Sequence, residues 1–385
     1  MAENAVHLLT ILSEAVQDGV VPGAAVVAGR GGVVSVRHAV GWRQLQPTAL
    51  PVEPGTIWDL ASLSKALCTS LLVMQAVGEG NAELDEPLEA APALAEPPAV
   101  AAITVRRALA HAAGFIPTAP FWRDALGADI TTPRAPIDRV GPASRAAVVA
   151  AARTESLAYF PGTRSLYSDL DFILLGDFLE RRLGDRLDRL AAARLGRPFG
   201  TDALGFRPLG GLAEAASVAA PLRSIAATAR SEERGGIMVG EVDDLNAYAM
   251  GGVAGHAGLF GSADAVAEVA LALIAAYKGA RLIGGPSLVE REVLRLFWTP
   301  AGIPGSTWRL GWDGPAPQGS LAGDRIARTA VGHLGFTGGS LWIDPEREAF
   351  VVLLTNRTHP TVRTDPRFPK LRRAVNDAAL AALGY

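Results

Sequence analysis

Two residues in one short segment have the types and the spacing for nucleophilic catalysis. In DLASLSKALCTS, residues 59–70, Lys65 follows Ser62 by three positions. If both lie on one helix, their side chains project from the same face, one turn apart. A serine hydroxyl is a weak nucleophile until a base takes its proton, and a desolvated amine is such a base. The N-terminus of this helix would also leave the Ser62 backbone N–H free to bind a developing oxyanion.

A lysine is unusual in this chain. Only three of the 36 basic residues are lysines, namely Lys65, Lys278 and Lys370. Arginine keeps its proton in proteins, whereas the pKa of a lysine amine responds to burial and to neighbouring charges. The lysine therefore suggests proton transfer at Ser62, although a pattern as short as S-x-x-K also occurs by chance.

Two further segments carry groups that could complete a site. PGTRSLYSDLDFILLG places Tyr167 and Asp169 directly before an apolar helix. GHLGFTGGSLWID places His333, Leu334 and Gly335 at the entry to a predicted strand. The glycines of this second segment would let the backbone approach a ligand closely.

Together the three segments resemble the motif set of the serine β-lactamase and penicillin-binding-protein superfamily. There, S-x-x-K is followed by a Y-x-N or Y-S-D motif and then by K-T-G or H-x-G near the C-terminal strands. The chain is most similar to the class C β-lactamase-related group, which includes D-alanyl-D-alanine carboxypeptidases and family VIII esterases. Flanking segments such as ITVRRALAHAAGF and FVVLLTNRTHP also resemble this group, so the resemblance covers about residues 5–380.

The resemblance implies a role for each motif residue. Ser62 would form the acyl-enzyme, and Lys65 and Tyr167 would share the duties of general base and acid, with the assignment between them open. The backbone N–H groups of Ser62 and Phe336 would form the oxyanion hole. The remaining positions, expected to bind substrate, are Asp169, His333 and Gly335.

Three departures from the family pattern bear on the substrate. His333 replaces a permanent cation, and histidine is mostly neutral at pH 7 at its reference pKa. Leu334 replaces a threonine and cannot donate a hydrogen bond. Because these two side chains help to hold the substrate carboxylate in β-lactamases and carboxypeptidases, their loss favours a neutral ester or amide. Asp169 replaces an asparagine found in many members, and its carboxylate would favour the ammonium form of Lys65 and oppose a Tyr167 phenolate.

Other candidate residues have simpler interpretations. Cys68 is expected to be a packed small hydrophobe on another helical face, and His111 is expected to be structural. His256, in GGVAGHAGLF, could line the cleft or serve only as a structural histidine. Aromatic residues in the irregular stretch 115–145 are candidates for an apolar acyl pocket, or they only pin their own loop: Phe115, Phe121 and Trp122.

The patterning around these motifs predicts an α+β fold. Residues 5–16 have one apolar helical face, residues 21–41 read as a hairpin around Gly29–Gly32, and the helix after Ser62 should stop at Gly78. SLWID and AFVVLLTN form a second hairpin, and a last helix runs from Pro366 to Leu383. Residues 79–249 read as an inserted, mostly helical domain within a discontinuous sheet domain, 1–78 and 250–385. The active site is expected at their interface.

Composition excludes several classes of protein. The chain has 385 residues, a formal net charge of −3 and no basic stripe, which argues against nucleic-acid binding. No apolar run is long enough to span a membrane. The single cysteine allows no intrachain disulfide, and the histidines show no metal-ligand spacing, so neither a metal nor another cofactor is expected. With no recognisable signal peptide, a cytoplasmic location is expected, or a periplasmic or secreted one if a signal was removed.

The sequence therefore predicts a serine hydrolase that works through an acyl-enzyme on Ser62. A carboxylesterase for small or medium acyl esters is favoured over a D-alanyl-D-alanine carboxypeptidase or a weak β-lactamase. The partner would be a small ester, amide or β-lactam, and the oligomeric state stays open. A penicillin-binding-type scaffold without turnover is the non-enzymatic alternative, and the joint presence of Ser62, Lys65 and Tyr167 argues against it.

Overall fold

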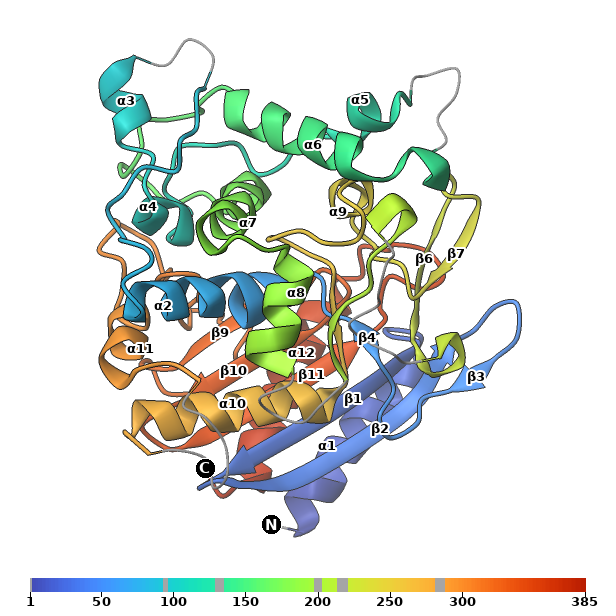
Figure 1. Ribbon diagram of the computed structural model, residues 1–385. Helices are drawn as coiled ribbons and strands as arrows, with labels where there is room; N and C mark the ends of the chain where they lie inside the picture. The colour runs from blue at the N-terminus through green and yellow to red at the C-terminus, as the bar shows by residue number, and fades with distance from the viewer. Residues whose placement is uncertain (1, 93–95, 129–134, 197–202, 213–220, 281–287) are drawn as a thin grey trace.

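The computed structural model describes residues 2–92, 96–128, 135–196, 203–212, 221–280 and 288–385 (Figure 1). At its centre is a six-stranded antiparallel sheet in the order β3-β2-β1-β11-β10-β9. The strands are β3 (Leu50–Pro51), β2 (Val33–Gln44), β1 (Gly23–Arg30), β11 (Ala349–Thr355), β10 (Ser340–Asp344) and β9 (Val331–Leu334). The α+β fold expected from the sequence is confirmed.

The first hairpin turns where the glycines are. Gly31 and Gly32 connect β1 to β2 with φ values of 59° and 80°, the conformation that a tight hairpin turn needs at both central positions. Along β1 the residues alternate between the two faces, so that Val26 and Val27 enter different hydrophobic clusters. Such alternation in a strand without polar positions requires helices on both faces of the sheet.

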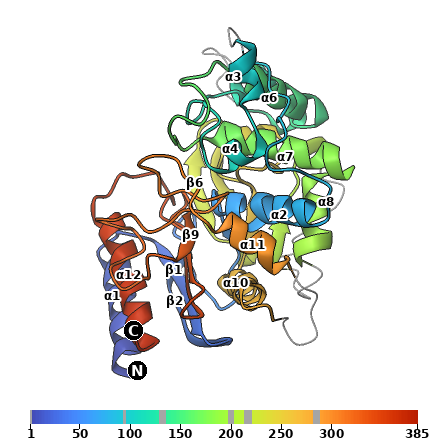
Figure 2. The ribbon, with the colours of Figure 1, turned by 90° about the vertical axis from the view of Figure 1, so that its left-hand side faces the viewer.

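Helices cover both faces (Figure 2). The terminal helices α1 (Ala2–Gln17) and α12 (Arg367–Ala382) pack against each other on one face, where Leu8 and Val375 are fully buried with Val351. On the other face lies α10 (Ala263–Tyr277), which contacts both β1 and β11. The sheet is thus packed between helices on its two faces. Strand β9 forms one edge of the sheet, on the side of the helix that follows Ser62.

The helix after Ser62 is buried on all sides. A π-helical segment, η1 (Lys65–Ser70), leads into α2 (Leu71–Gly78), which ends at the predicted glycine. The sequence pattern did not indicate the π-helical turns, which often occur at functional sites. The Ser70 hydroxyl donates to the Lys65 carbonyl at 2.7 Å inside this segment. Cys68 is fully buried here, as expected for a packing residue.

The segment between residues 79 and 249 is helical in its first part. Its α-helices are α3 (Pro97–Ala101), α4 (Val105–Leu109), α5 (Trp122–Leu126), α6 (Pro142–Thr154), α7 (Asp169–Leu183), α8 (Leu187–Ala191) and α9 (Leu245–Ala249). Its second part also contains three short strands that the sequence did not predict, β5 (Leu204–Phe206), β6 (Ala227–Ser231) and β7 (Gly236–Val239). There, β5 joins a small sheet with β4 (Trp58–Asp59) and β8 (Leu259–Gly261). The division into two domains at residues 78 and 249 stays a prediction.

Two further elements complete the architecture. The short helix α11 (Arg291–Phe297) packs against α2 and α10 beside the sheet. Of the irregular stretch 115–145, residues 129–134 lie outside the described residues. In the described part of the chain, no helix has both the length and the apolar character needed to cross a bilayer.

Candidate active site

Ser62 and Lys65 meet as the spacing predicts. The Lys65 amine lies 3.0 Å from Ser62 Oγ, within hydrogen-bond distance. It also donates to Asp169 Oδ1 at 2.7 Å and to the His256 carbonyl at 3.1 Å. The lysine side chain is fully buried, whereas Ser62 lines a pocket. The amine is thus held by three oxygen atoms, one of which belongs to the candidate nucleophile.

The protonation state of Lys65 differs from that of a desolvated amine ready to act as a base. Burial alone would lower the pKa of the amine, but the Asp169 carboxylate, followed by the Tyr167 hydroxyl, outweighs burial and raises that pKa above its ordinary value. Lys65 therefore rests as an ammonium at neutral pH. Burial therefore does not by itself prepare this lysine to lose its proton, and Asp169 favours the ammonium form of Lys65, as expected from the sequence.

Tyr167 lies directly before α7, and its neighbours in the chain are held by His111. The Ser168 side chain caps α7, while the Ser168 backbone N–H donates to His111 Nδ1 at 3.1 Å. The Leu166 backbone N–H donates to the His111 carbonyl at 2.8 Å, and the rings of His111 and Tyr167 lie 4.6 Å apart. His111 is fully buried and has a φ of 52°, so it has the structural role expected of it.

The backbone before Ser62 adopts a sharp turn. Ala61 has a φ of 47°, a conformation rarely adopted by residues with a side chain, and its N–H donates to Asp59 Oδ1 at 2.8 Å. The other Asp59 oxygen accepts the Asp243 N–H at 2.7 Å. Burial, followed by the Asp243 charge, raises the pKa of Asp59 to about 7. This carboxyl group fixes the turn that presents Ser62 to the pocket.

Phe336, which the resemblance implies as the second oxyanion donor, lies in a loop next to the turn that carries Ser62. It follows β9 in a loop that the Thr337 hydroxyl ties to the Asp59 carbonyl at 2.8 Å. Gly335 allows this loop to lie against the turn, because a Cβ at this position would be 2.9 Å from the Leu60 carbonyl oxygen. The loop and the turn before Ser62 are thereby held side by side, and an oxyanion hole formed by the two N–H groups stays a prediction.

His333 and Leu334 point in different directions. Leu334 lines the pocket, as do Gly335 and Phe336. His333 is 2% exposed, and its Nδ1 lies 2.8 Å from the Leu334 carbonyl oxygen. Burial, followed by the Lys65 charge, lowers the pKa of His333 to about 3, so that the ring is neutral. A direct contact between His333 and substrate stays a prediction; in the structure the ring lies behind the pocket wall, near Tyr167.

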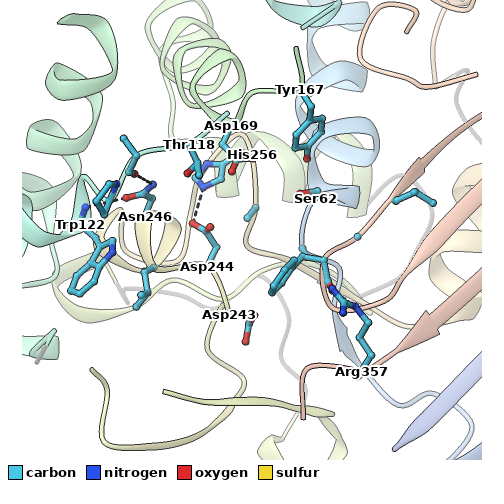
Figure 3. A pocket seen from close by; sticks show the side chains of 18 of the residues that line it. Ser62, Thr118, Trp122, Tyr167, Asp169, Asp243, Asp244, Asn246, His256 and Arg357 are labelled. Atoms are coloured by element: carbon cyan, nitrogen blue, oxygen red, sulfur yellow. Dashed lines mark hydrogen bonds and ion pairs between the residues drawn. The ribbon is translucent and has the colours of Figure 1, made fainter. Parts of the chain in front are cut away.

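These residues surround a pocket of about 720 Å³ (Figure 3). Ser62, Tyr167 and Asp169 line one side, and Trp122 lines another with the apolar residues Pro120 and Leu245. Of the aromatic residues proposed for an acyl pocket, Trp122 is thus in the wall. Phe115 is fully buried in the core, and Phe121 packs against that core.

His256 lines the same pocket and is paired with a residue that the sequence analysis did not consider. His256 Nε2 lies 2.8 Å from Asp244 Oδ1, and that oxygen also accepts the Ala247 N–H as the cap of α9. Burial would raise the pKa of Asp244, but His256 outweighs burial and lowers it to about 2. The sequence left two roles open for His256, lining the cleft or supporting the structure. In the structure it lines the pocket and is also held by a structural partner, Asp244.

The pocket also contains two arginines that the sequence motifs did not indicate. Arg357 follows β11, and Arg372 belongs to α12; both line the pocket beside Phe336. The only signal in the sequence was the segment FVVLLTNRTHP, which resembled the family without suggesting a role for its arginine. No group of three or more His, Cys, Asp or Glu side chains suited to a metal ion occurs among the described residues.

Known proteins resemble this chain in sequence and in fold. A putative D-alanyl-D-alanine carboxypeptidase of Escherichia coli K12 is 27% identical over 336 residues, covering 82% of this chain and 73% of that protein. An octameric penicillin-binding protein homologue from Pyrococcus abyssi superposes with a TM-score of 0.70 and 21% identity, over 97% of this chain and 77% of that one. EstCE1, a hydrolase with promiscuous acyltransferase activity, gives a TM-score of 0.69 and 19% identity, over 98% of both chains.

The family itself is identified from the sequence over almost its whole length. The sequence profile described as beta-lactamase matches residues 9–376. This range contains the serine and lysine of the first motif, the tyrosine of the second and the H-L-G of the third. The chain belongs to the beta-lactamase family of serine hydrolases.

Proposed function

We propose that this serine hydrolase is a carboxylesterase that cleaves esters with small or medium acyl groups through an acyl-enzyme on Ser62. The observation that carries the choice of ester is Leu334, an apolar side chain in the pocket wall beside Phe336. Behind it, His333 is buried and neutral, so the H-L-G segment supplies neither the hydroxyl nor the permanent cation of a K-T-G motif. Ser62 and its lysine supply the nucleophile, whatever the substrate.

In the proposed acylation step, Ser62 Oγ attacks the ester carbonyl carbon and loses its proton. Because Lys65 rests as an ammonium, Tyr167, whose ring lies 4.9 Å from the Lys65 amine, is the better candidate to accept this proton. The N–H groups of Ser62 and Phe336 stabilise the oxyanion. The C–O bond to the alcohol then breaks, and the alcohol departs with the proton from Tyr167. Water repeats the sequence on the acyl-enzyme and releases the acid.

A substrate panel tests this proposal. We expect a burst and steady turnover with p-nitrophenyl acetate and butyrate, and slower turnover of nitrocefin and of D-Ala-D-Ala peptides. Faster cleavage of nitrocefin or of the peptides would reject the ester preference and leave the acyl-enzyme intact. Absence of both a burst and Ser62 labelling by a fluorophosphonate would instead favour a binding protein without turnover.

D-alanyl-D-alanine carboxypeptidase activity is the second candidate. It has support from the name of the Escherichia coli relative and from Arg357, which lines the pocket next to Phe336 and could face an anionic peptide end. The same peptide panel separates it from the esterase. β-Lactam turnover has no comparable support in the pocket beyond the family membership.

Leu334→Thr should raise the rate of nitrocefin hydrolysis relative to that of p-nitrophenyl butyrate, by about threefold to tenfold. The reason is that a threonine hydroxyl at this pocket position could donate a hydrogen bond to the lactam carboxylate, a contact typically equivalent to about 1 kcal/mol. The matched control is Leu334→Val, which has the shape of threonine without the hydroxyl. Equal rate ratios in the two variants would show that the lost hydroxyl does not determine the substrate preference.

Asp169→Asn should change the pH dependence of kcat/KM at both ends. The Asp169 carboxylate keeps Lys65 protonated, so its removal should move the alkaline limb to lower pH by about one unit or more. We also propose that the acid limb depends on the ion pair between Asp169 and Lys65, so that this limb would then be lost or displaced. Asp169→Glu, which retains the charge, should preserve both limbs in the same stopped-flow or ester assay. An unchanged profile for the asparagine variant would refute this role of Asp169.

A further inference from the structure

Arg357 and Arg372 bring two positive charges to one wall of the pocket. The Arg357 guanidinium is half-buried over the rings of Phe336 and Phe368, at 5.0 and 5.1 Å. Arg372 is 8% exposed and lies over the other side of the same cluster, 4.7 Å from the Phe368 ring. The Arg372 charge is therefore largely desolvated, which is costly for an ion without a counter-charge, whereas the Arg357 charge remains partly open to the pocket.

Neither arginine is neutralised in the described part of the chain. Arg357 Nε donates to the Phe336 carbonyl at 2.8 Å, and Arg372 Nη2 donates to the Gly335 and Gly339 carbonyls at 2.7 and 3.0 Å. Carboxylate partners are absent there, whereas the similarly buried Arg145 is paired with Glu180 at 2.7 Å. Main-chain carbonyls satisfy hydrogen bonds but leave the net charge in place.

The two guanidinium groups also act on each other. Burial, followed by the charge of Arg357, lowers the pKa of Arg372 to about 9. Burial likewise lowers the pKa of Arg357, and the Asp243 carboxylate, which lines the same pocket, opposes that change only in part. Like charges held together at a pocket wall are stabilised when an anion enters between them or beside them.

The acidic residues of the pocket are occupied elsewhere. Asp169 is paired with Lys65, and Asp244 is paired with His256. Asp243 accepts the Ala229 N–H at 3.3 Å, and burial raises its pKa. The pocket is therefore not uniformly negative, and its excess positive charge lies at the Phe336 end. In Figure 3, Arg357 and Asp244 approach the pocket from different walls.

We propose that Arg357 is a carboxylate anchor, so that the preferred ester carries a carboxylate a few bonds from the scissile carbonyl. The position follows from the chain: Arg357 holds the carbonyl of Phe336, the residue whose N–H is the expected oxyanion donor. A guanidinium binds carboxylate through parallel N–H donors. Arg357 Nη1 donates to the Arg363 carbonyl at 3.4 Å, and Nη2 has no acceptor among the described residues, so it can donate to an incoming anion. Arg372 stabilises the loop at residues 335–339 through its hydrogen bonds to the Gly335 and Gly339 carbonyls, and it adds positive potential to this end of the pocket. The inference rests on the proposed ester hydrolysis and corrects the expectation of a neutral substrate.

Matched pairs of esters test this anchor and locate the carboxylate. Monophenyl glutarate and phenyl pentanoate differ by a carboxylate on the acyl side, and 3-acetoxybenzoate and methyl 3-acetoxybenzoate differ by one on the leaving group. After correction for the hydroxide-catalysed rate, kcat/KM should be about tenfold higher for the anionic member of one pair. Arg357→Met should abolish the preference, while Arg373→Met, a change on the exposed side of α12, should retain it.

A second measurement needs only the wild-type protein and p-nitrophenyl butyrate as substrate. Boronic acids form adducts with active-site serines, and 3-carboxyphenylboronic acid should inhibit at about one tenth of the concentration needed with phenylboronic acid. If p-nitrophenyl butyrate is hydrolysed but neither the esters nor the boronic acids show a preference for the anion, the anchor is refuted and the esterase stands. A preference that survives Arg357→Met also refutes it. If no ester is hydrolysed and Ser62 is not labelled, the proposed function itself fails.

Discussion

Replacement of Ser62 by alanine should lower kcat/KM for p-nitrophenyl butyrate by about 10⁴-fold or more and abolish the burst. Loss of the nucleophile removes the covalent route, and only binding and the oxyanion donors would remain. The fold should be retained, because Ser62 lies at the pocket and its backbone turn is fixed by Asp59 and Ala61. Mass spectrometry after incubation with a fluorophosphonate should show one adduct on the wild type and none on the variant.

Ser64→Ala provides the matched control for this variant. Ser64 lies two residues away but is fully buried, donating to the Ala61 carbonyl at 2.6 Å and accepting the Leu259 N–H at 3.0 Å. Its loss should cost about 1 kcal/mol of unfolding free energy and leave the adduct in place. A fluorophosphonate adduct that persists in Ser62→Ala, or disappears in Ser64→Ala, would show that the nucleophile has been assigned to the wrong serine.

The parts of the fold that followed from the sequence are those with a regular apolar period. The hairpin at Gly31 and Gly32, the end of α2 at Gly78 and the terminal helices each depend on local patterning, which one sequence contains. The strands β5, β6 and β7 are short and lie in a segment dominated by alanine, so their pairing depends on distant residues. The π-helical turns of η1 likewise depend on tertiary contacts that the pattern does not report.

The site shows the same division between local and distant information. Ser62 and Lys65 could be paired from their spacing alone, and Tyr167 joined them only through resemblance to a known motif set. The pairs that set the charge of the pocket join residues far apart in the chain, such as Lys65 with Asp169 and His256 with Asp244. Neither Arg357 nor Arg372 belongs to a motif that signals chemistry. Their importance comes from where the fold places them and from the absence of a carboxylate beside them among the described residues.

The lysine illustrates how structure can reverse an argument from residue type. Its scarcity suggested that the site needs an amine able to release a proton, since arginine would have served as a fixed cation. The structure instead surrounds the amine with oxygen acceptors and a carboxylate, which raises its pKa. Lysine is still required in this arrangement, because a compact ammonium with three donors fits three separate oxygens, whereas a planar guanidinium does not.

Replacement of Lys65 should therefore be nearly as damaging with arginine as with methionine. We expect Lys65→Arg and Lys65→Met each to lower kcat/KM for p-nitrophenyl butyrate by about 10³-fold, because proton transfer to and from Ser62 and Tyr167 is disrupted in both. Arginine restores the charge, yet at this fully buried position its planar fork cannot direct donors to the same three oxygen atoms as the ammonium does. Lys278→Arg, at a partly exposed lysine that lies 3.9 Å from Glu348, should leave kcat/KM unchanged. Activity of Lys65→Arg within tenfold of wild type would mean that only the positive charge is needed, and that the fit of the ammonium to its three oxygen atoms is not.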